Sequence, residues 1–202
     1  MPPFYDPPYD SPIEDEFAQR YVKYAADNVE MRTQVDAPTL CGRFVVDFVL
    51  STPSGHRVGI ECDGKEFHDE HRDEWRDAMI IGDGVLDDIY RVRGSDIVHN
   101  MDDVLYLLAN FEPDLFDPRA QVNLRVLTRT EVLDLGKERE RDRWRITYLS
   151  EKGSVEGSLL LEARRRVIPP NQRRFWSVAY HHAVSLGGGR LDDVMKDHQS
   201  RK

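Results

Sequence analysis

The sequence is poor in cysteine, with only Cys41 and Cys62 among its 202 residues. Two cysteines cannot form a disulfide framework or a four-cysteine zinc site, so both of these scaffolds are excluded. Each cysteine lies beside apolar, strand-like residues. Because free cysteine is among the most buried residue types, we expect both to be reduced core residues.

The sequence also lacks an apolar run of the roughly 18 residues that a membrane-spanning helix needs. Its N-terminus, MPPFYDPPYD, has neither the basic nor the apolar region of a secretory signal peptide. With 40% hydrophobic and 32% charged residues, the composition is that of a folded chain and not of a disordered one. We therefore expect a cytoplasmic protein without a membrane partner.

Positive charge is scarce in the first part of the chain. Residues 1–118 contain 10 Lys and Arg against 26 Asp and Glu, whereas residues 119–202 contain 18 against 11, within a formal net charge of −9. Such asymmetry suggests that the two parts meet different partners. A carboxylate-rich part can approach phosphate when divalent cations bind in it, because the ions reverse the local field. The acidity is thus compatible with a metal-dependent nuclease.

Apolar periodicity predicts an α/β layer domain at residues 11–112, after an extended Pro-rich tail at 1–10. Ser11 and Pro12 are typical of a helix start, and the apolar spacing that follows predicts a helix of about 18 residues. The further predicted elements are a β-hairpin formed by RFVVDFVL from Arg43 and HRVGIECD up to Asp63, a helix at 69–81, a strand at 88–93 and a helix at 101–111. This order predicts a mixed sheet flanked by helices.

The composition changes after residue 118. Strand-like pieces at 121–128, 143–149 and 157–163, with a helix from about 170 to 186, predict a small basic α+β extension at 119–190. A polar tail at 191–202 follows.

Three carboxylates interrupt or end the two strands of the predicted hairpin. Strand alternation places Glu61 and Asp63 on one face, and hairpin pairing would bring Asp47 opposite them. Buried carboxylates are costly unless they are paired or bound to metal. We therefore expect these three residues to hold Mg²⁺, with Mn²⁺ as an alternative, and this ion to activate water against a phosphate. Lys65 would supply a cation for the phosphate and His68 an acid or base.

The pattern around these residues resembles the very-short-patch repair endonuclease-like branch of the PD-(D/E)xK nucleases. The resemblance covers roughly residues 11–100 and rests on Ser11-Pro12-Ile13-Glu14, Gln34, Arg43, Asp47-Phe48, Ile60-Glu61-Cys62-Asp63-Gly64, His68, Arg76-Asp77 and Arg91-Val92-Arg93. It implies a restriction endonuclease-like core in which Asp47 is the main metal-binding carboxylate. It also implies that Glu61 or the carbonyl of Cys62 adds a ligand, that Glu14 reaches in from the first helix, and that His68 works near the attacking water.

Two departures from the family pattern bear on activity and specificity. Asp63 stands where the (D/E)xK triplet has its lysine, and Lys65 lies two residues further on. The cysteine-held zinc of the repair enzymes has no counterpart here, so mismatch specificity is not implied.

Basic residues provide candidate contacts to nucleic acid. The candidates are Arg43, Arg76, Arg91 and Arg93, with the cluster Arg164, Arg165, Arg166, Arg173 and Arg174 near two aromatic residues. The alternative is that Arg76, Arg91 and Arg93 are internal ion-pair partners of the acidic core and that the later cluster is a solvated strand end.

The hypothesis that unites these features is a Mg²⁺-dependent DNA endonuclease that acts in restriction, phage defence or repair. Two alternatives stay open, namely a catalytically inactive nuclease fold that binds nucleic acid or serves in assembly, and an RNA nuclease. A homodimer or a partner protein of a defence or repair system is compatible with either.

Overall fold

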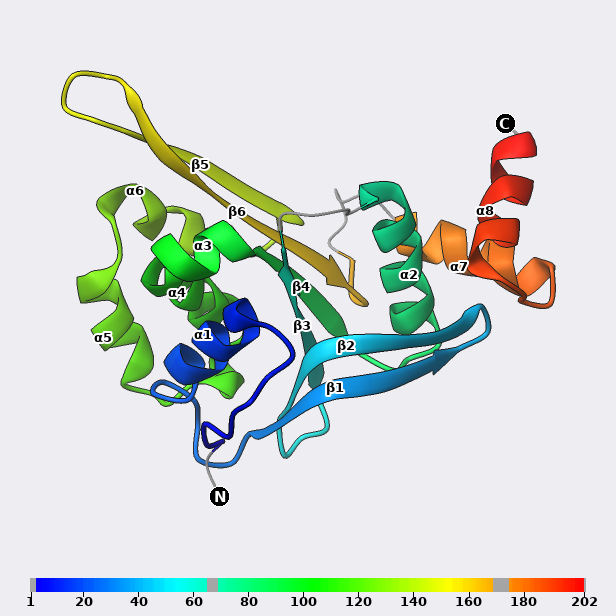
Figure 1. Ribbon diagram of the computed structural model, residues 1–202, viewed down its shortest axis with the longest axis horizontal. Coiled ribbons are helices and arrows are strands. Elements are labelled where there is room, and N and C mark those ends of the chain that lie inside the picture. Colours follow the sequence, from blue (N-terminus) through cyan, green and yellow to red (C-terminus); the bar gives the residue numbers. More distant parts are fainter. Residues whose placement is uncertain (1–2, 65–68, 169–174, 202) are drawn as a thin grey trace.

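The protein folds as a six-stranded mixed sheet between two layers of helices (Figure 1). The computed structural model describes residues 3–64, 69–168 and 175–201. The strands are β1 (Glu30–Thr39), β2 (Gly42–Ser51), β3 (Arg57–Asp63), β4 (Asp88–Arg93), β5 (Arg143–Leu149) and β6 (Val155–Arg165). Their order is β1-β2-β3-β4-β6-β5, in which β3 and β4 are parallel and every other neighbouring pair is antiparallel.

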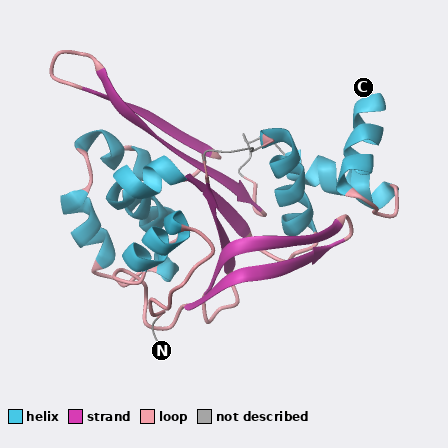
Figure 2. Ribbon diagram, viewed as in Figure 1, coloured by secondary structure: helices cyan, strands magenta, loops and turns pink. Residues whose placement is uncertain are grey.

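The helices cover both faces of the sheet (Figure 2). One layer contains α1 (Pro12–Tyr21), α3 (Gly94–His99), α4 (Met101–Phe111), α5 (Ala120–Leu127) and α6 (Thr130–Leu133), with short 3₁₀ turns at Pro113–Leu115 and Leu135–Lys137. The other contains α2 (Glu70–Gly82), α7 (Phe175–Ser185) and α8 (Leu191–Ser200). None of the described helices is both long and apolar enough to cross a membrane.

Each face of the sheet has its own apolar core. On the α1 and α4 side, Phe17, Phe48 and Trp144 are fully buried in the larger core. On the other side, Trp75 and Met79 of α2 pack with residues of α7 and α8. Because both faces are covered, a charged side chain on a central strand lies in a poorly hydrated place and needs a partner.

Much of the predicted element order is confirmed. The hairpin corresponds to β2 and β3, the strand at 88–93 to β4, and the helices at 69–81 and 101–111 to α2 and α4. The first helix does begin at Ser11, whose hydroxyl accepts a hydrogen bond from the amide of Glu14. It ends at Tyr21, however, and has 10 residues in place of about 18.

Three elements differ from the prediction. Residues 121–128 do not form a strand, since α5 occupies Ala120–Leu127 with Leu124 buried and Val122 exposed. The predicted polar tail contains α8, whose Leu191 and Val194 are buried beside α2. Strand β1 was not predicted, and its Pro38 is tolerated because β1 is an edge strand.

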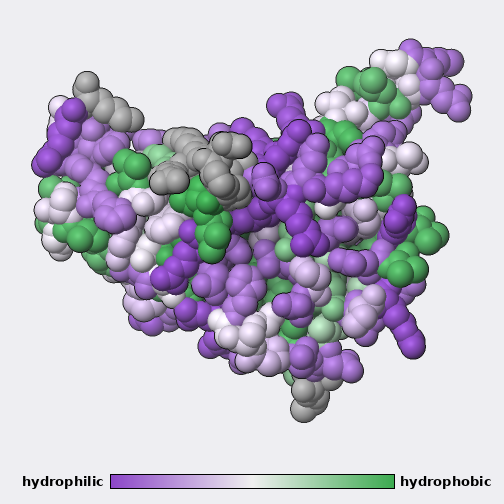
Figure 3. All heavy atoms as spheres, turned by 180° about the vertical axis from the view of Figure 1, so that it is seen from behind, coloured by the Kyte–Doolittle hydropathy of each residue, from purple (hydrophilic) through white to green (hydrophobic). Residues whose placement is uncertain are grey.

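The sheet continues across the predicted boundary after residue 118. Strand β6 pairs with β4 from Asp88↔Arg165 to Val92↔Leu161, so the predicted extension shares its sheet with the first part of the chain. The β5–β6 hairpin then projects beyond the helical layers as an arm (Figure 1). Leu149 and Val155, near its end, are 58% and 70% exposed, and apolar surface is visible on the arm from behind (Figure 3).

Candidate active site

Asp47 lies where the pairing of β1 and β2 is interrupted. Paired residues flank the position on both sides, but Gln34 opposite it has a φ of 49°, in the left-handed region. Phe48 packs in the α1-side core, whereas Val46 packs on the α2 side. Residues two apart on a regular strand share a face, so strand β2 must rotate at Asp47. The regular alternation of β2 is therefore interrupted at Asp47 itself.

The side chain of Asp47 connects β2 to β3. Its Oδ2 accepts a hydrogen bond from the backbone amide of Cys62 at 2.8 Å. The pKa of Asp47 is raised to about 6, chiefly by burial and also by the carboxylates of Glu14 and Asp63, whereas the Cys62 amide and Arg76 oppose the rise. The position therefore disfavours an ionised Asp47 unless a cation is close.

Glu61, on β3 near the half-buried Asp47, is the more deeply buried of the two carboxylates. It is 4% exposed, and its Oε1 lies 2.5 Å from Nη2 of Arg76 on α2. Neither atom has a hydrogen bond of suitable geometry within the described part of the chain. Burial raises the pKa of Glu61 to about 8, with Asp47 and Asp77 adding to the effect while Arg76 opposes it.

Glu14 approaches the same place from α1. It is 6% exposed, its Oε1 accepts from the hydroxyl of Ser11 at 2.7 Å, and its Oε2 accepts from Nε2 of Gln34 at 3.0 Å. Gln34, the residue with the left-handed backbone conformation, thus orients the carboxylate of Glu14. Glu14 lies near enough to Asp47 to contribute to its raised pKa.

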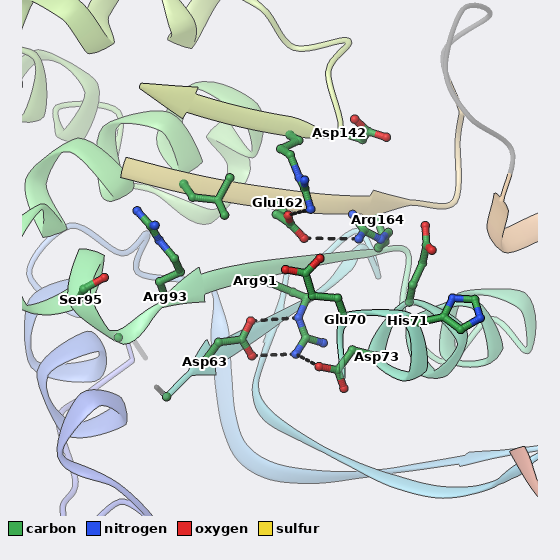
Figure 4. Close-up of a pocket in the computed structure, with 15 residues that line it drawn as sticks. Asp63, Glu70, His71, Asp73, Arg91, Arg93, Ser95, Asp142, Glu162 and Arg164 are labelled. Atoms are coloured by element: carbon green, nitrogen blue, oxygen red, sulfur yellow. Dashed lines mark hydrogen bonds and ion pairs between the residues drawn. The ribbon is translucent and has the colours of Figure 1, made fainter. Parts of the chain in front are cut away.

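Asp63 faces a different partner. It shares the α2 side of β3 with Glu61, and both of its oxygens accept from Arg91 of β4, at 2.7 and 3.0 Å (Figure 4). Arg91 also donates to Asp73 at 3.0 Å and to the fully buried Asp77 at 3.3 Å. Asp63 is therefore part of a network of carboxylates around the buried guanidinium of Arg91.

The predicted metal ligands do not converge as a set of three. Among the described residues, the group of three whose ligand atoms all lie within 4.8 Å of one another is His56, Asp88 and Glu112, not Asp47, Glu61 and Asp63. Sequence reasoning missed the former group entirely. No spacing signal could have found it, because its members come from three elements far apart in the chain.

A cavity of about 920 Å³ opens beside Asp63, between α2 and strands β4 and β6 (Figure 4). Its described lining contains four arginines, Arg91, Arg93, Arg143 and Arg164, and six carboxylates. The excess of carboxylates means that a phosphate entering this cavity would need additional positive charge.

The described arginines of the predicted basic cluster, Arg164 to Arg166, lie in different surroundings. Arg164 lines the cavity, whereas Arg165 lies over the ring of Trp144 with 5.1 Å to its centroid and donates to the hydroxyl of Tyr90 at 3.2 Å. Arg166 is 3.8 Å from Asp87. Because neighbouring strand residues face opposite sides, Arg164 and Arg165 do not form one surface.

Most of the other basic residues that were predicted to contact nucleic acid form ion pairs within the protein. Arg43 forms an exposed ion pair with Asp36, and Arg93 donates to Asp96 at 2.7 Å. Arg76 and Arg91 are buried and held by carboxylates, as the ion-pair alternative expects. Lys65, His68, Arg173 and Arg174 lie outside the described residues.

Comparison of this chain with protein-family models, with curated proteins and with solved structures finds no match. The structure itself shows an α/β fold with an open, mixed six-stranded sheet flanked by helices.

Proposed function

We propose that this chain is a metal-dependent endonuclease that hydrolyses DNA phosphodiester bonds on a restriction endonuclease-like core. The observation that carries the proposal is the pair of carboxylates Asp47 and Glu61 on adjacent strands, both with raised pKa values caused first by burial. A fold gains nothing in stability from placing two such groups together. Their placement is explained if a cation binds between them.

The donor set fits Mg²⁺, which prefers carboxylate oxygens and keeps several waters. Oxygens of Asp47 and Glu61 would hold the ion, and Glu14 is oriented toward the same place by Gln34. Oε1 of Glu61 lies 2.5 Å from Nη2 of Arg76, so this buried carboxylate stands where positive charge is needed. When bound, the ion would supply a water of lowered pKa and stabilise charge on the phosphate.

The chain's own residues have separable roles in this proposal. The ion pair of the partly buried Asp63 with the buried Arg91 would fix the end of β3 against α2 and β4, and would thereby hold Glu61 in its buried position. Lys65 and His68, which follow directly in the sequence, are proposed as the phosphate-binding cation and as the acid or base. The proposed ancestry in the very-short-patch repair endonuclease-like branch rests on the sequence pattern.

The cavity beside Asp63 supports a phosphate-containing substrate. Arg143 and Arg164 lie on strands of the arm, and Arg93 on β4, so cationic groups from three strands face the opening. Such contacts position a nucleic-acid backbone without reading its sequence. The surrounding carboxylates make this binding dependent on divalent cations.

A cleavage assay tests the proposal. The full-length protein is incubated with supercoiled, linear, mismatched and modified DNA and with RNA, each with Mg²⁺, with Mn²⁺ and with a chelator. We expect cleavage of at least one DNA substrate that depends on the divalent ion. Cleavage of RNA alone would assign the RNA nuclease alternative, and cleavage that persists in the chelator would contradict the metal-dependent proposal.

The second candidate is a catalytically inactive nuclease fold that binds nucleic acid or serves in assembly. It is favoured by Asp63, which stands where the nuclease family has its lysine and which accepts hydrogen bonds from Arg91. Isothermal titration of the protein with Mg²⁺ and Mn²⁺ discriminates the two candidates. If the centre is active, the wild type binds the ion and Asp47→Asn does not. If the centre is catalytically inactive, Asp47→Asn leaves the ion binding unchanged.

A further inference from the structure

A second cluster of ligand-type side chains lies at the opposite edge of the two parallel strands. His56 directly precedes β3, and Asp88 is the first residue of β4, so both lie where these strands begin. Glu112 ends α4 and reaches the same edge. Glu61 and Asp63 lie further along β3, toward its carboxyl end, so the cluster is separate from the candidate active site.

The three side chains converge from elements that are distant in sequence. Nε2 of His56 is 2.9 Å from Oε2 of Glu112 and 3.6 Å from Oδ2 of Asp88, and the ligand atoms of all three residues lie within 4.8 Å of one another. Ligands bonded to one tetrahedral cation at about 2.0–2.2 Å stand roughly 3.3–3.6 Å apart. The distance from His56 to Asp88 is therefore that of a metal site, and the contact between His56 and Glu112 has to open by about half an ångström.

The residues around the cluster orient its members as the surroundings of a metal site do. Oδ2 of Asp87 lies 3.5 Å from Nδ1 of His56, on the far side of the ring from Asp88 and Glu112. The hydroxyl of Tyr90 donates to Oε1 of Glu112 at 2.6 Å and leaves Oε2 directed at the imidazole. A metal-binding histidine usually has a carboxylate on its second nitrogen, and a ligating carboxylate is usually held by a further hydrogen bond.

The carboxylates at the cluster outnumber its imidazole, which favours binding of a cation. Three carboxylates, from Asp87, Asp88 and Glu112, surround one imidazole, and the side chains of Asp88 and Glu112 are only 13% and 11% exposed. Two arginines face it, because Arg166 is 3.8 Å from Asp87 and Arg165 contacts the hydroxyl of Tyr90.

We propose that His56, Asp88 and Glu112 form a binding site for a divalent transition-metal cation of the Zn²⁺ type, with a fourth position filled by water. One imidazole and two carboxylates suit Zn²⁺ better than Mg²⁺, which prefers oxygen donors alone. The side chain of His56 is 34% exposed and gives the ion a path from solvent. Binding ties the β2–β3 turn to β4 and to the end of α4.

Cobalt serves as the probe, because Co²⁺ replaces Zn²⁺ and its visible absorption reports nitrogen and oxygen ligands. The metal-stripped full-length protein is titrated with Co²⁺ and then with Zn²⁺ at pH 7.5. We expect saturable binding of one Co²⁺ with a visible band, its displacement by Zn²⁺, and a rise in Tm.

Two variants and two matched controls locate the ion. His56→Gln and Asp88→Asn should each weaken Co²⁺ binding roughly 100-fold or more, since even loss of an outer partner costs about 10–100-fold. His182→Gln removes a histidine that also contacts a carboxylate, 3.1 Å from Asp197, and should keep the site. Asp47→Asn should keep it too, which separates this proposal from the candidate active site.

The outcomes divide cleanly. If the wild-type protein binds no Co²⁺ saturably, or if both cluster variants bind it as tightly as the wild type, the cluster is a buried ion pair only and the proposal is overturned. If His56→Gln does not fold, as circular dichroism would show, the result with Asp88→Asn decides, because that substitution keeps the shape of the side chain and relieves a buried charge.

Discussion

The buried guanidinium of Arg91 provides a quantitative test of the network that holds the candidate active site. Its side chain is 7% exposed and contacts Asp63, Asp73 and Asp77 at 2.7, 3.0 and 3.3 Å. Replacing it with methionine keeps most of the side-chain volume but removes the charge that these three carboxylates share. Breaking a buried ion pair by removing one partner costs about 3–5 kcal/mol, because the remaining charge stays buried.

We therefore expect Arg91→Met to lower the free energy of unfolding by about 3–5 kcal/mol. For a chain of this length that loss corresponds to a fall in Tm of roughly 6–20 °C. Arg91→Lys should lose less, since it keeps the charge but not the planar fork that contacts Asp63 at two points. Equilibrium unfolding in urea at pH 7 measures both variants.

The matched control is Arg32→Met, which breaks an ion pair to Glu30 at 3.5 Å with 53% of the arginine side chain exposed. An exposed pair of this kind contributes about 0–1 kcal/mol. A double-mutant cycle of Arg91→Met with Asp77→Asn should give a coupling energy of about 1–3 kcal/mol. If Arg91→Met is no less stable than Arg32→Met, the network does not stabilise the fold and the reasoning is refuted.

Three further predictions address the pH dependence, the backbone and the substrate surface. The pKa of Glu61 is raised from 4.5 to about 8, so the folded state binds more protons than the unfolded state in that window, and wild-type stability should fall as pH rises through it. In Glu61→Gln this fall should shrink, as urea midpoints at pH 5.5 and 8.5 would show, and an unchanged fall would contradict the assignment. Because φ of Gln34 is 49°, Gln34→Val should be less stable than Gln34→Gly by about 1 kcal/mol, and equal urea midpoints would argue against strain there. Arg143→Gln, at the cavity, should weaken DNA binding and reduce the slope of log affinity against log salt by about 1, while the exposed Arg125→Gln on α5 should not; identical slopes would remove Arg143 from the interface.

The parts of the fold that could be predicted are those in which one apolar pattern decides the structure. Strands β2 and β3 alternate around a short turn, and α4 carries Val104, Leu105 and Leu108 on a buried side. Helix α5 was mistaken for a strand because AQVNLRVL contains valines typical of strands. In the structure Val122 and Val126 are exposed, so tertiary packing of Leu124 and not local preference decides the helix.

Some contacts of the candidate site could be predicted from local patterns in the sequence, and others could not. Alternation along β3 was enough to put Glu61 and Asp63 on one face, and hairpin pairing indicated that Asp47 lies near β3, although the rotation of β2 at Asp47 was not predictable. The contact between Asp63 and Arg91 was not predictable, because it depends on β3 and β4 being parallel neighbours in a particular register. The convergence of His56, Asp88 and Glu112 depends in addition on where α4 ends against the sheet.

The most direct test of the central claim is single-turnover DNA cleavage by Asp47→Asn in Mg²⁺. The substitution keeps the shape of a side chain that accepts one hydrogen bond from Cys62 but removes its charge. Asp36→Asn, which alters an exposed carboxylate of β1 paired with Arg43, is the matched control. We predict that Asp47→Asn folds and binds DNA but does not cleave it, while Asp36→Asn cleaves as the wild type does. Wild-type cleavage by a folded Asp47→Asn protein would contradict the account.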